Sequence, residues 1–290
     1  MKQLTKAPLS FRVADFLARN GVRGGYRLLD VAEKLGRLNV EVKYSVGRGV
    51  ELRVPLHREA NRWSLEEVLR YDRVLIEHFV AAARSWSRPV TMVDCGADIG
   101  TIAVKFAAVY PEVERIIAIE PNDEAFPYLK RNLAPLSSKV EWHNAAVSDF
   151  VGMGELVRPS YDPSDHACFI QPSESGTIPV LRVDDLNIND GNTVLIKIDV
   201  EGHELNVLRG ALETLQRAPG FVVAFEAHRY VAERTGVDPV ECIRLLQSVS
   251  PCRIYAAGAP ELELNADESV FKNTDRKKFD IVCVSRSPAN

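Results

Sequence analysis

MVDCGADIGTIAVKFAAVYPEVERIIAIE, residues 92–120, joins a short apolar run, a glycine turn, a helical pattern and a second apolar run. The first run ends at Asp94 and the second ends at Glu120. Gly96 and Gly100 permit close backbone approaches, and they place the unpaired N–H groups of a helix N-terminus beside the turn. A carboxylate at the tip of the second strand can accept hydrogen bonds from two ribose hydroxyls. The stretch therefore predicts a nucleoside-binding α/β unit.

The turn itself distinguishes between nucleosides. A dinucleotide fingerprint reads G-x-G-x-x-G, so that the backbone can close on a pyrophosphate. This turn reads DCGADIG, with Asp98 where the middle glycine would fall. An acid there repels phosphate and suits S-adenosylmethionine (SAM), which carries an ammonium and a sulfonium charge and no phosphate. The structural alternative is an ordinary tight strand-to-helix turn.

The composition is that of an ordinary soluble globular protein. The chain has 290 residues, of which 46% are apolar and 26% are charged, and its net charge is −4. That charge gives no general attraction to nucleic acid, so we expect no nucleic-acid partner. We find no apolar run near the roughly 20 residues that cross a bilayer, and no signal-peptide pattern. We therefore expect a cytoplasmic protein without a transmembrane segment.

The N-terminal part shows no catalytic constellation. Residues 10–36 favour two short helices, and the strict alternation over residues 40–54 around a glycine turn predicts a hairpin. Ser64 and Glu67 form a capping box ahead of a single amphipathic helix over residues 65–79. These elements indicate a helical and hairpin cap.

The domain boundary is predicted near Pro89. Residues 1–87 would form the cap, which contacts substrate or a second copy of the chain, and a homo-oligomer is compatible with this division. Residues 88–290 would form the SAM-binding domain.

A third strand is predicted over residues 139–147. Its end, Asn144-Ala145-Ala146, falls where an adenine ring would lie if SAM is the ligand, and the two alanines would leave room for a flat ring. Residues 150–176 are rich in glycine, proline, serine and aspartate. They predict a hairpin fragment and a loop that covers the substrate.

Two further strands, residues 194–198 and 221–225, run into ionisable residues, and one helix is predicted after the first of them. Ligands of open α/β sheets lie at the carboxyl ends of the strands. Buried acids are costly unless they are paired, so packing alone does not explain such a cluster. The residues expected on this edge are Asp199, Glu201, His203, Glu204, Glu226 and His228.

Six motifs follow one another along the chain: VDCGADIG, AIEPNDEAF, NAAVSD, VLRVDDL, LIKIDVEGHELNVLRGA and VAFEAH. In this order and spacing, over roughly residues 90–230, they resemble the FkbM family of SAM-dependent methyltransferases. The resemblance implies a class I (Rossmann-like) α/β fold, with a seven-stranded, mostly parallel sheet whose last strand is antiparallel and with helices on both faces. It also implies methylation of a hydroxyl on a sugar, glycolipid or polyketide-type acceptor.

The resemblance also assigns cofactor contacts. The glycine turn would line the methionine side of SAM, Glu120 would hold the ribose, and residues 144–146 would border adenine. Family members often carry Asn where this chain has Asp98. The Asp98 carboxylate could pair with the ammonium group of SAM. The full set of cofactor-binding candidates is Asp94, Gly96, Ala97, Asp98, Gly100, Glu120, Asn144, Ala145, Ala146 and Asp199.

Methylation of a weakly acidic hydroxyl needs a base that removes the proton during attack. Histidine, with an ordinary pKa of about 6.5, can accept a proton near pH 7. Our candidates are His203 and Asp199, followed by Glu226 and His228, although His203 is equally typical of a helix cap. No metal is favoured. If Mg²⁺ were used, Asp199, Glu201 and Glu226 would hold it.

Two other functions fit parts of the sequence. An NAD(P)-dependent oxidoreductase would use the same fold, but the missing middle glycine disfavours it. A SAM-binding interaction protein without turnover would fit Asp98 and the long cap. A methyl-transfer assay separates this second alternative from the methyltransferase.

Overall fold

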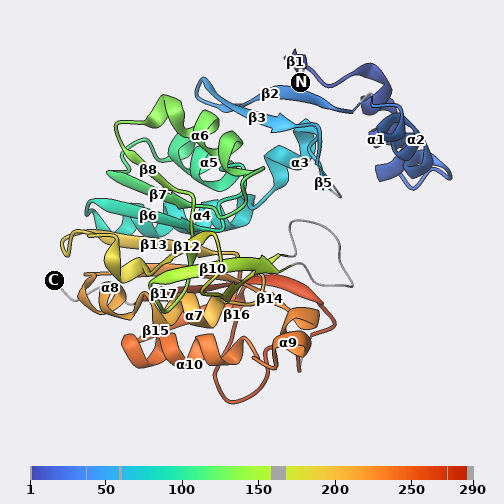
Figure 1. Ribbon diagram of the computed structural model, residues 1–290. Helices are drawn as coiled ribbons and strands as arrows, with labels where there is room; N and C mark the ends of the chain where they lie inside the picture. The colour runs from blue at the N-terminus through green and yellow to red at the C-terminus, as the bar shows by residue number, and fades with distance from the viewer. Residues whose placement is uncertain (1, 37, 59–60, 158–167, 273, 286–290) are drawn as a thin grey trace. The chain divides into compact units, whose positions relative to one another are not determined.

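The structure is a computed structural model, and it describes residues 2–36, 38–58, 61–157, 168–272 and 274–285 (Figure 1). The chain divides into two compact units, Met1–Arg73 and Val74–Asn290. This division falls before the domain boundary that the sequence analysis placed after residue 87. No helix in the described ranges is long and apolar enough to span a membrane.

The first unit is built on a three-stranded sheet with the order β1-β2-β3, in which β1 and β2 are parallel and β2 and β3 are antiparallel. The predicted two helices and hairpin are confirmed, and the hairpin turns through Gly47 and Gly49, both with positive φ. The elements are β1 (Lys2–Leu4), α1 (Leu9–Arg19), α2 (Gly25–Lys34), β2 (Val40–Gly47), β3 (Val50–Pro55), β4 (His57–Arg58), β5 (Asn61–Arg62) and α3 (Leu65–Arg70).

The predicted capping box at Ser64 is present. The Ser64 hydroxyl accepts a hydrogen bond from the Glu67 backbone N–H at 3.2 Å. This bond satisfies one of the N–H groups that the first turn of a helix leaves unpaired. The capped helix is shorter than predicted, however. It ends at Arg70, because Asp72 adopts a left-handed φ of 47° before α4 (Arg73–Trp86) begins.

Removing this cap gives a first testable expectation. Ser64→Ala should lower the stability of α3 by about 1 kcal/mol, because one backbone N–H loses its partner. Hydrogen exchange of the α3 amides should then be about fivefold faster. Ser10→Ala is the matched control, since Ser10 lies exposed inside α1 and does not cap it. Equal exchange rates in the two variants would contradict the capping role.

The second unit is organised around an eight-stranded sheet with the order β16-β15-β17-β14-β13-β6-β7-β8. The five strands from β14 to β8 are parallel, and β17 is antiparallel to both of its neighbours. The strands are β6 (Val90–Cys95), β7 (Arg115–Ile119), β8 (Val140–His143), β13 (Thr193–Ile198), β14 (Phe221–His228), β15 (Cys252–Ala256), β16 (Ala259–Glu263) and β17 (Lys278–Ser285).

This sheet confirms the class I fold and corrects the strand count from seven to eight. The additional strand, β16, pairs only at the edge with β15. Its residues are mostly exposed, so they lack the apolar alternation by which a half-buried strand is recognised. The sequence analysis therefore did not identify it.

Helices cover both faces of the large sheet, as predicted. Figure 1 shows α5 and α6 on one side and α7, α8 and α10 on the other. One large apolar core lies between the sheet and this second group, and it includes Val207, Leu215 and Leu246. The helices are α5 (Thr101–Val109), α6 (Phe126–Leu133), α7 (Glu204–Arg209), α8 (Leu212–Arg217), α9 (Arg229–Thr235) and α10 (Val240–Val249), with short 3₁₀ turns at Ala134–Leu136 and Val183–Asp185.

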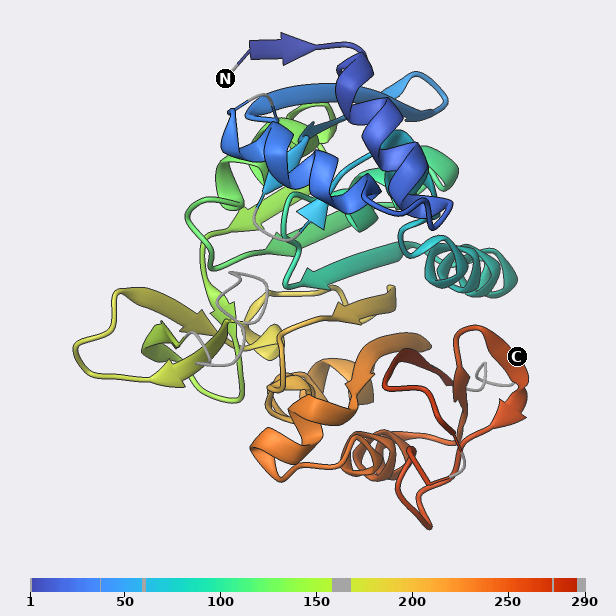
Figure 2. The same ribbon diagram turned by 90° about the vertical axis from the view of Figure 1, so that its right-hand side faces the viewer.

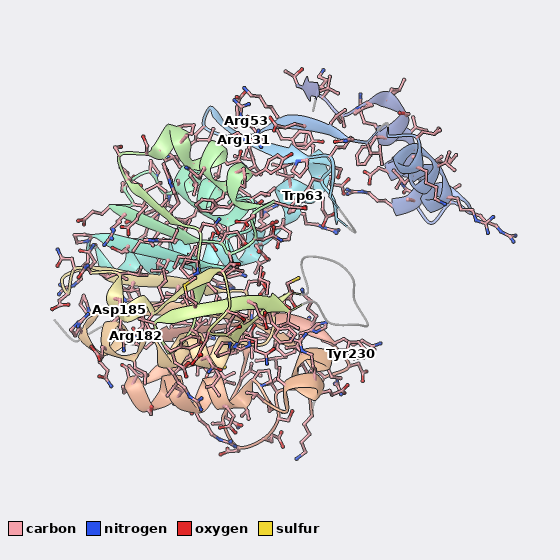
Figure 3. The ribbon with its side chains drawn as sticks, in the orientation of Figure 1. Arg53, Trp63, Arg131, Arg182, Asp185 and Tyr230 are labelled. Atoms are coloured by element: carbon pink, nitrogen blue, oxygen red, sulfur yellow. The ribbon has the colours of Figure 1, made fainter. Side chains whose placement is uncertain are left out.

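The single helix predicted after residue 198 is wrong, because the chain breaks between α7 and α8. Gly210 lies at the break, where a Cβ atom would come 2.1 Å from the Ser148 carbonyl oxygen. Asp184 then caps the second helix, since its carboxylate accepts from the Thr214 N–H at 2.8 Å. The adjacent Asp185 forms an ion pair with Arg182 at 2.8 Å, and the two side chains lie together in Figure 3.

A second, four-stranded sheet has the order β11-β10-β12-β9 and lies at the left of Figure 2. The strand predicted over residues 139–147 is therefore two strands in different sheets, β8 and β9. The hairpin predicted within residues 150–176 is present as β10 and β11, whereas residues 158–167 of the predicted covering loop lie outside the described residues. The strands are β9 (Ala146–Val147), β10 (Gly152–Val157), β11 (Phe169–Pro172) and β12 (Ile178–Leu181).

Candidate functional site

The glycine turn follows β6 and is fixed between the ends of the two strands that flank it. The N–H groups of Gly96 and Ala97 both donate to the Ile119 carbonyl at 3.0 Å, and the Asp199 N–H donates to the Cys95 carbonyl at 3.0 Å. Gly96 has a φ of 78°, and a Cβ atom there would lie 1.9 Å from the Asp199 carbonyl oxygen. The position therefore requires glycine for both its conformation and its close approach.

Glu120 closes the turn from the end of β7. One carboxylate oxygen accepts from the Asp98 N–H at 2.7 Å, and the other accepts from the Asn122 N–H at 2.8 Å. Each oxygen of an ionised carboxylate can accept more than one hydrogen bond. Glu120 thus has the chemistry that its predicted ribose contact needs.

A buried lysine, Lys197, lies one residue before the end of β13. Lys197 stands opposite Asp94 in the parallel register of β6 and β13, and both residues are only 1% exposed. The Lys197 ammonium lies 2.9 Å from an Asp199 carboxylate oxygen. A buried ammonium is costly without an acidic partner, so the Asp199 carboxylate stabilises it. The sequence analysis did not identify Lys197, although a lysine inside the apolar run VLIKI was the available signal.

Two of the three residues predicted to border adenine lie in apolar cores. Ala145 belongs to the large core and Ala146 to the small core that includes Val180. The Asn144 side chain donates to the Asp123 carboxylate at 2.7 Å. The structure therefore gathers Asp94, Gly96, Ala97, Asp98, Gly100, Glu120 and Asp199 at the turn and its flanking strand ends, and it packs the two alanines into cores.

Three carboxyl groups come together just beyond the end of β13 and within the last residues of β14. Asp199, Glu201 and Glu226 each offer an oxygen atom within 4.8 Å of the others. The Lys278 ammonium lies 2.6 Å from a Glu226 oxygen. We call these three acids the carboxyl cluster. Lys278 carried no distinct sequence signal, because it ends a run of three cations, yet it begins β17 opposite His228.

Burial shifts the protonation of the carboxyl cluster. Burial, with repulsion from Asp199, raises the pKa of Glu201 to about 7. Burial and repulsion from the same acid raise the pKa of Glu226 to about 8, in spite of the Lys278 ammonium. Burial alone would lower the pKa of Lys278, but attraction to Glu226 and Asp199 raises it above its ordinary value. Glu201 and Glu226 together therefore hold a proton near neutral pH.

The two candidate histidines are neutral at pH 7. Burial, followed by the Arg234 charge, lowers the pKa of His203, and burial with the Lys278 and Arg234 charges lowers that of His228. The His203 ring forms no capping hydrogen bond and stacks on Phe169 at a centroid distance of 6.0 Å. The Nδ1 atoms of both histidines are buried and form no hydrogen bond within the described part of the chain. Both rings can therefore accept a proton.

Arg234 is a further residue that sequence reasoning missed. Its guanidinium lies 4.5 Å from the centroid of the Phe169 ring, on which His203 stacks. It also donates to the Glu201 carbonyl, which holds Glu201 in its left-handed conformation with a φ of 54°. Arg234 thus connects α9 with the loop after β13 that carries the candidate residues Glu201 and His203.

The raised pKa values predict how stability depends on pH. A carboxyl whose pKa is raised by folding contributes stability that is complete below about pH 4.5 and is lost as the pH rises through its folded pKa. The free energy of unfolding should therefore fall between pH 5.5 and pH 8.5 by roughly 1–3 kcal/mol more in the wild type than in Glu226→Gln. The lowered histidine pKa values make the free energy of unfolding rise with pH, but they do so in both the wild type and Glu226→Gln. Urea unfolding at the two pH values checks this, and identical pH dependence would contradict it.

Comparisons with known proteins agree with this arrangement. A model of the methyltransferase FkbM domain matches residues 94–250. Hexuronic acid methyltransferase AglP of Haloferax volcanii is 29% identical over 160 residues, which cover 53% of this chain and 59% of that protein. The match thus spans less than two thirds of the length of that curated relative.

Similar folds occur among solved structures. Methyltransferase FkbM from Methylobacillus flagellatus KT is 19% identical with a TM-score of 0.44, and the match covers 76% of this chain and 53% of that one. A SAM-dependent methyltransferase from Agrobacterium tumefaciens is 11% identical with a TM-score of 0.44, and the match covers 86% and 70%. Because both scores are below 0.5, the fold assignment rests on the strand order of the large sheet.

Proposed function

Because the chain belongs to the FkbM methyltransferase family, we propose that it transfers a methyl group from SAM to a hydroxyl group of a sugar-type acceptor. The observation that carries the proposal is the carboxyl cluster, which shares Asp199 with the glycine turn. A nucleoside-binding turn and a group of proton acceptors therefore meet at one residue. This combination suits a reaction in which a cofactor and a weakly acidic hydroxyl react directly.

The cofactor contacts follow from the turn. When bound, SAM supplies an electrophilic methyl group on a sulfonium leaving group. Gly96 and Gly100 place no side chain at two positions of the turn, and Glu120 would accept the ribose hydroxyls with its carboxylate oxygens. Asp98 would pair with the ammonium group. The family match and the fit of these side chains support the assignment.

The carboxyl cluster would handle the proton. We assign Glu226 as the acceptor of the hydroxyl proton, because a base is most effective when its pKa lies near the working pH. Burial, with repulsion from Asp199 and Glu201, keeps that pKa high, and Lys278 stabilises the ionised form. His203 and His228 are the alternative bases, since their neutral rings can also accept a proton.

The proposed acceptor class is a sugar. The relative from Haloferax volcanii is described as a hexuronic acid methyltransferase, which makes hexuronates the first acceptors to test. Glycolipid and polyketide-type hydroxyls are the other classes that the family resemblance suggests. An oxidoreductase would need a turn that tolerates pyrophosphate, and Asp98 opposes this.

The direct test uses SAM with a trideuterated methyl group and glucuronic acid as the acceptor. Mass spectrometry of the product should locate the label on a ring hydroxyl, and excess S-adenosylhomocysteine (SAH) should suppress the transfer. A label on the carboxylate oxygen would overturn the hydroxyl assignment. Tight SAH binding without transfer to any acceptor in a panel of sugars, glycolipids and polyketides would favour an interaction protein without turnover.

The charges around the cluster predict that no divalent metal is needed. Three carboxylates suit Mg²⁺, whose preferred ligands are oxygens. Two ammonium groups already lie close to them, Lys278 at 2.6 Å from Glu226 and Lys197 at 2.9 Å from Asp199. Activity after EDTA treatment should therefore stay within about twofold of the untreated protein. A loss of about tenfold or more that Mg²⁺ restores would show that the cluster is a metal site.

A further inference from the structure

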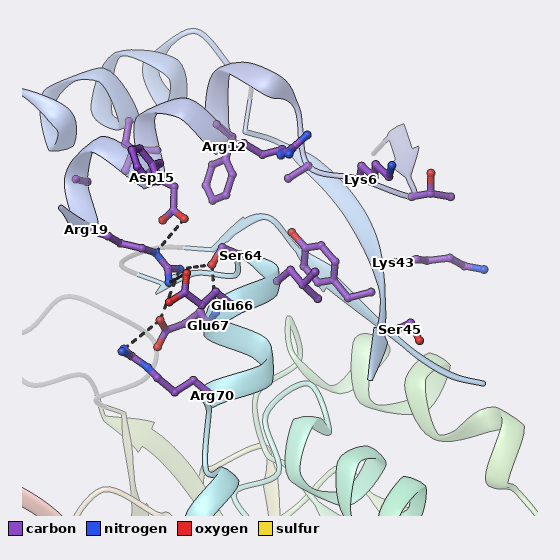
Figure 4. Close-up of a pocket in the computed structure, with 18 of the residues that line it drawn as sticks. Lys6, Arg12, Asp15, Arg19, Lys43, Ser45, Ser64, Glu66, Glu67 and Arg70 are labelled. Carbon is purple, nitrogen blue, oxygen red and sulfur yellow. Dashed lines mark hydrogen bonds and ion pairs between the residues drawn. The ribbon is translucent and has the colours of Figure 1, made fainter. Parts of the chain in front are cut away.

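The first unit contains a cleft of about 1210 Å³, and every described residue that lines it belongs to that unit (Figure 4). Helices α1 and α3 and strand β2 supply most of the lining. Pockets that enclose small organic ligands usually measure about 300–1,000 Å³, so this cleft can hold a ligand of at least that size. None of the residues assigned above to SAM or to proton transfer lines it.

The acidic side chains of the cleft already have cationic partners. The Arg19 guanidinium lies 3.0 Å from Asp15 and 3.1 Å from Glu66, and Arg70 lies 3.5 Å from Glu67. Figure 4 shows this network on one side of the cleft. The Arg19–Glu66 pair joins α1 to the start of α3, and the other two pairs each lie within a single helix. These pairs account for the acids structurally.

Two cations of the lining have no such partner. Lys6 and Arg12 form no side-chain hydrogen bond or ion pair with any residue that the structure describes, and Figure 4 shows them away from the Arg19 network. Among the described residues of the lining, five side chains are cationic and three are acidic. Lys43 pairs with Glu51 outside the lining at 2.9 Å, which leaves an excess of one positive charge. An arginine and a lysine that line the cleft without an acidic partner among the described residues favour a ligand with a carboxylate or phosphate group.

A buried hydroxyl points to a second kind of contact. Tyr44 lines the cleft and is 5% exposed, and its hydroxyl forms no hydrogen bond with any described residue. Burial and the nearby Asp15 charge raise the pKa of Tyr44 to about 12, so the phenol remains a donor at neutral pH. A buried polar group without a partner is costly, and a ligand oxygen would remove that cost. Phe11 and Phe16 add apolar surface beside it.

We propose that this cleft binds a sugar that carries a phosphate or carboxylate group, with Lys6 and Arg12 contacting the anion and Tyr44 donating to a sugar oxygen. A neutral sugar would leave the two cations without a partner, and a bare anion would leave the Tyr44 hydroxyl and the apolar lining unused. The site goes beyond the proposed methyl transfer, since it holds whether or not its ligand is the methyl acceptor.

The test is calorimetric titration of the full chain with glucose 1-phosphate, glucuronate, glucose and inorganic phosphate. Glucose 1-phosphate and glucuronate should each bind at least about tenfold more tightly than glucose, because only they pair with the cations. Glucose 1-phosphate should also bind about threefold or more tightly than inorganic phosphate. Equal affinities for glucose and both anionic sugars, or for phosphate and glucose 1-phosphate, would overturn the proposal.

Matched variants locate the binding. Arg12→Gln should weaken glucose 1-phosphate binding by about tenfold, whereas Arg27→Gln, an equal loss of charge at an exposed position of α2 outside the cleft, should leave it unchanged. Equal losses in both variants would indicate general charge attraction and overturn the site.

The Tyr44 contact is tested separately. Tyr44→Phe should weaken binding of glucose 1-phosphate by about three- to tenfold, because one hydrogen bond is lost and the side chain keeps its shape. Unchanged affinity in this variant would remove the hydroxyl from the site. SAH affinity, measured on every variant, should not change, so failure of the cleft and failure of the methyltransferase assignment give different results. Arg12 is exposed, so Arg12→Gln tests the cleft even if Tyr44→Phe does not fold.

Discussion

Gly96→Ala is expected to lower the free energy of unfolding of the second unit by at least about 3 kcal/mol and to abolish SAH binding. Alanine at the observed φ of 78° costs about 1–2 kcal/mol by itself. The added Cβ atom would also lie 1.9 Å from the Asp199 carbonyl oxygen, which is backbone and cannot rotate away. The end of β13 must therefore shift, and the turn and the carboxyl cluster must shift with it. Urea unfolding and SAH calorimetry measure both effects.

Gly236→Ala separates the cost of the positive φ from the cost of the steric clash. Gly236 has a φ of 71°, but a Cβ atom there would meet nothing within 4 Å. This variant should lose only the conformational term, about 1–2 kcal/mol, and should bind SAH normally. If Gly96→Ala lost no more stability than Gly236→Ala and also bound SAH, the close approach of the turn to β13 would be wrong.

Glu226→Gln is expected to lower kcat by about 10²- to 10⁴-fold with little change in SAH affinity, because an amide cannot take the hydroxyl proton. The kcat of the wild type should rise with pH through the region of pH 7–8, in which the carboxyl cluster loses its proton. Steady-state kinetics with the acceptor identified in the methyl-transfer assay measure both effects.

Two further variants show whether a loss of kcat in Glu226→Gln reflects the role of Glu226 as the base. Glu263→Gln is a matched control, since Glu263 is an exposed carboxylate of β16 that pairs with Arg253, and it should retain full activity. His203→Ala tests the alternative base. A large loss of kcat in His203→Ala together with near-normal turnover in Glu226→Gln would transfer the role of base to His203.

Local signals were sufficient to predict the glycine turn. Gly96, Gly100 and the acids at the strand ends lie within one short stretch, and parallel strands bring such ends to one edge of a sheet. The resemblance to a known family supplied the class of sheet. The edge strand β16 and the breaks at Asp72 and Gly210 were missed. Each depends on tertiary packing or on an unusual backbone conformation of a residue without a strong turn signal.

The charge partners of the site could not be predicted from the sequence. Lys197 meets Asp199 two residues away, but its burial depends on the strands on both sides of β13. Lys278 meets Glu226 across an antiparallel register between strands that are about fifty residues apart in the chain. The pKa shifts of the carboxyl cluster follow from these pairings and from burial, so they become visible only in the folded structure.

Calorimetric titration of the full chain with SAH, with NADH in a parallel titration, tests the central claim most directly. A SAM-dependent methyltransferase should bind SAH with a dissociation constant on the order of micromolar and should not bind NADH detectably. Binding of NADH without binding of SAH would contradict the account, because it would mean that the turn at Asp98 accepts a pyrophosphate.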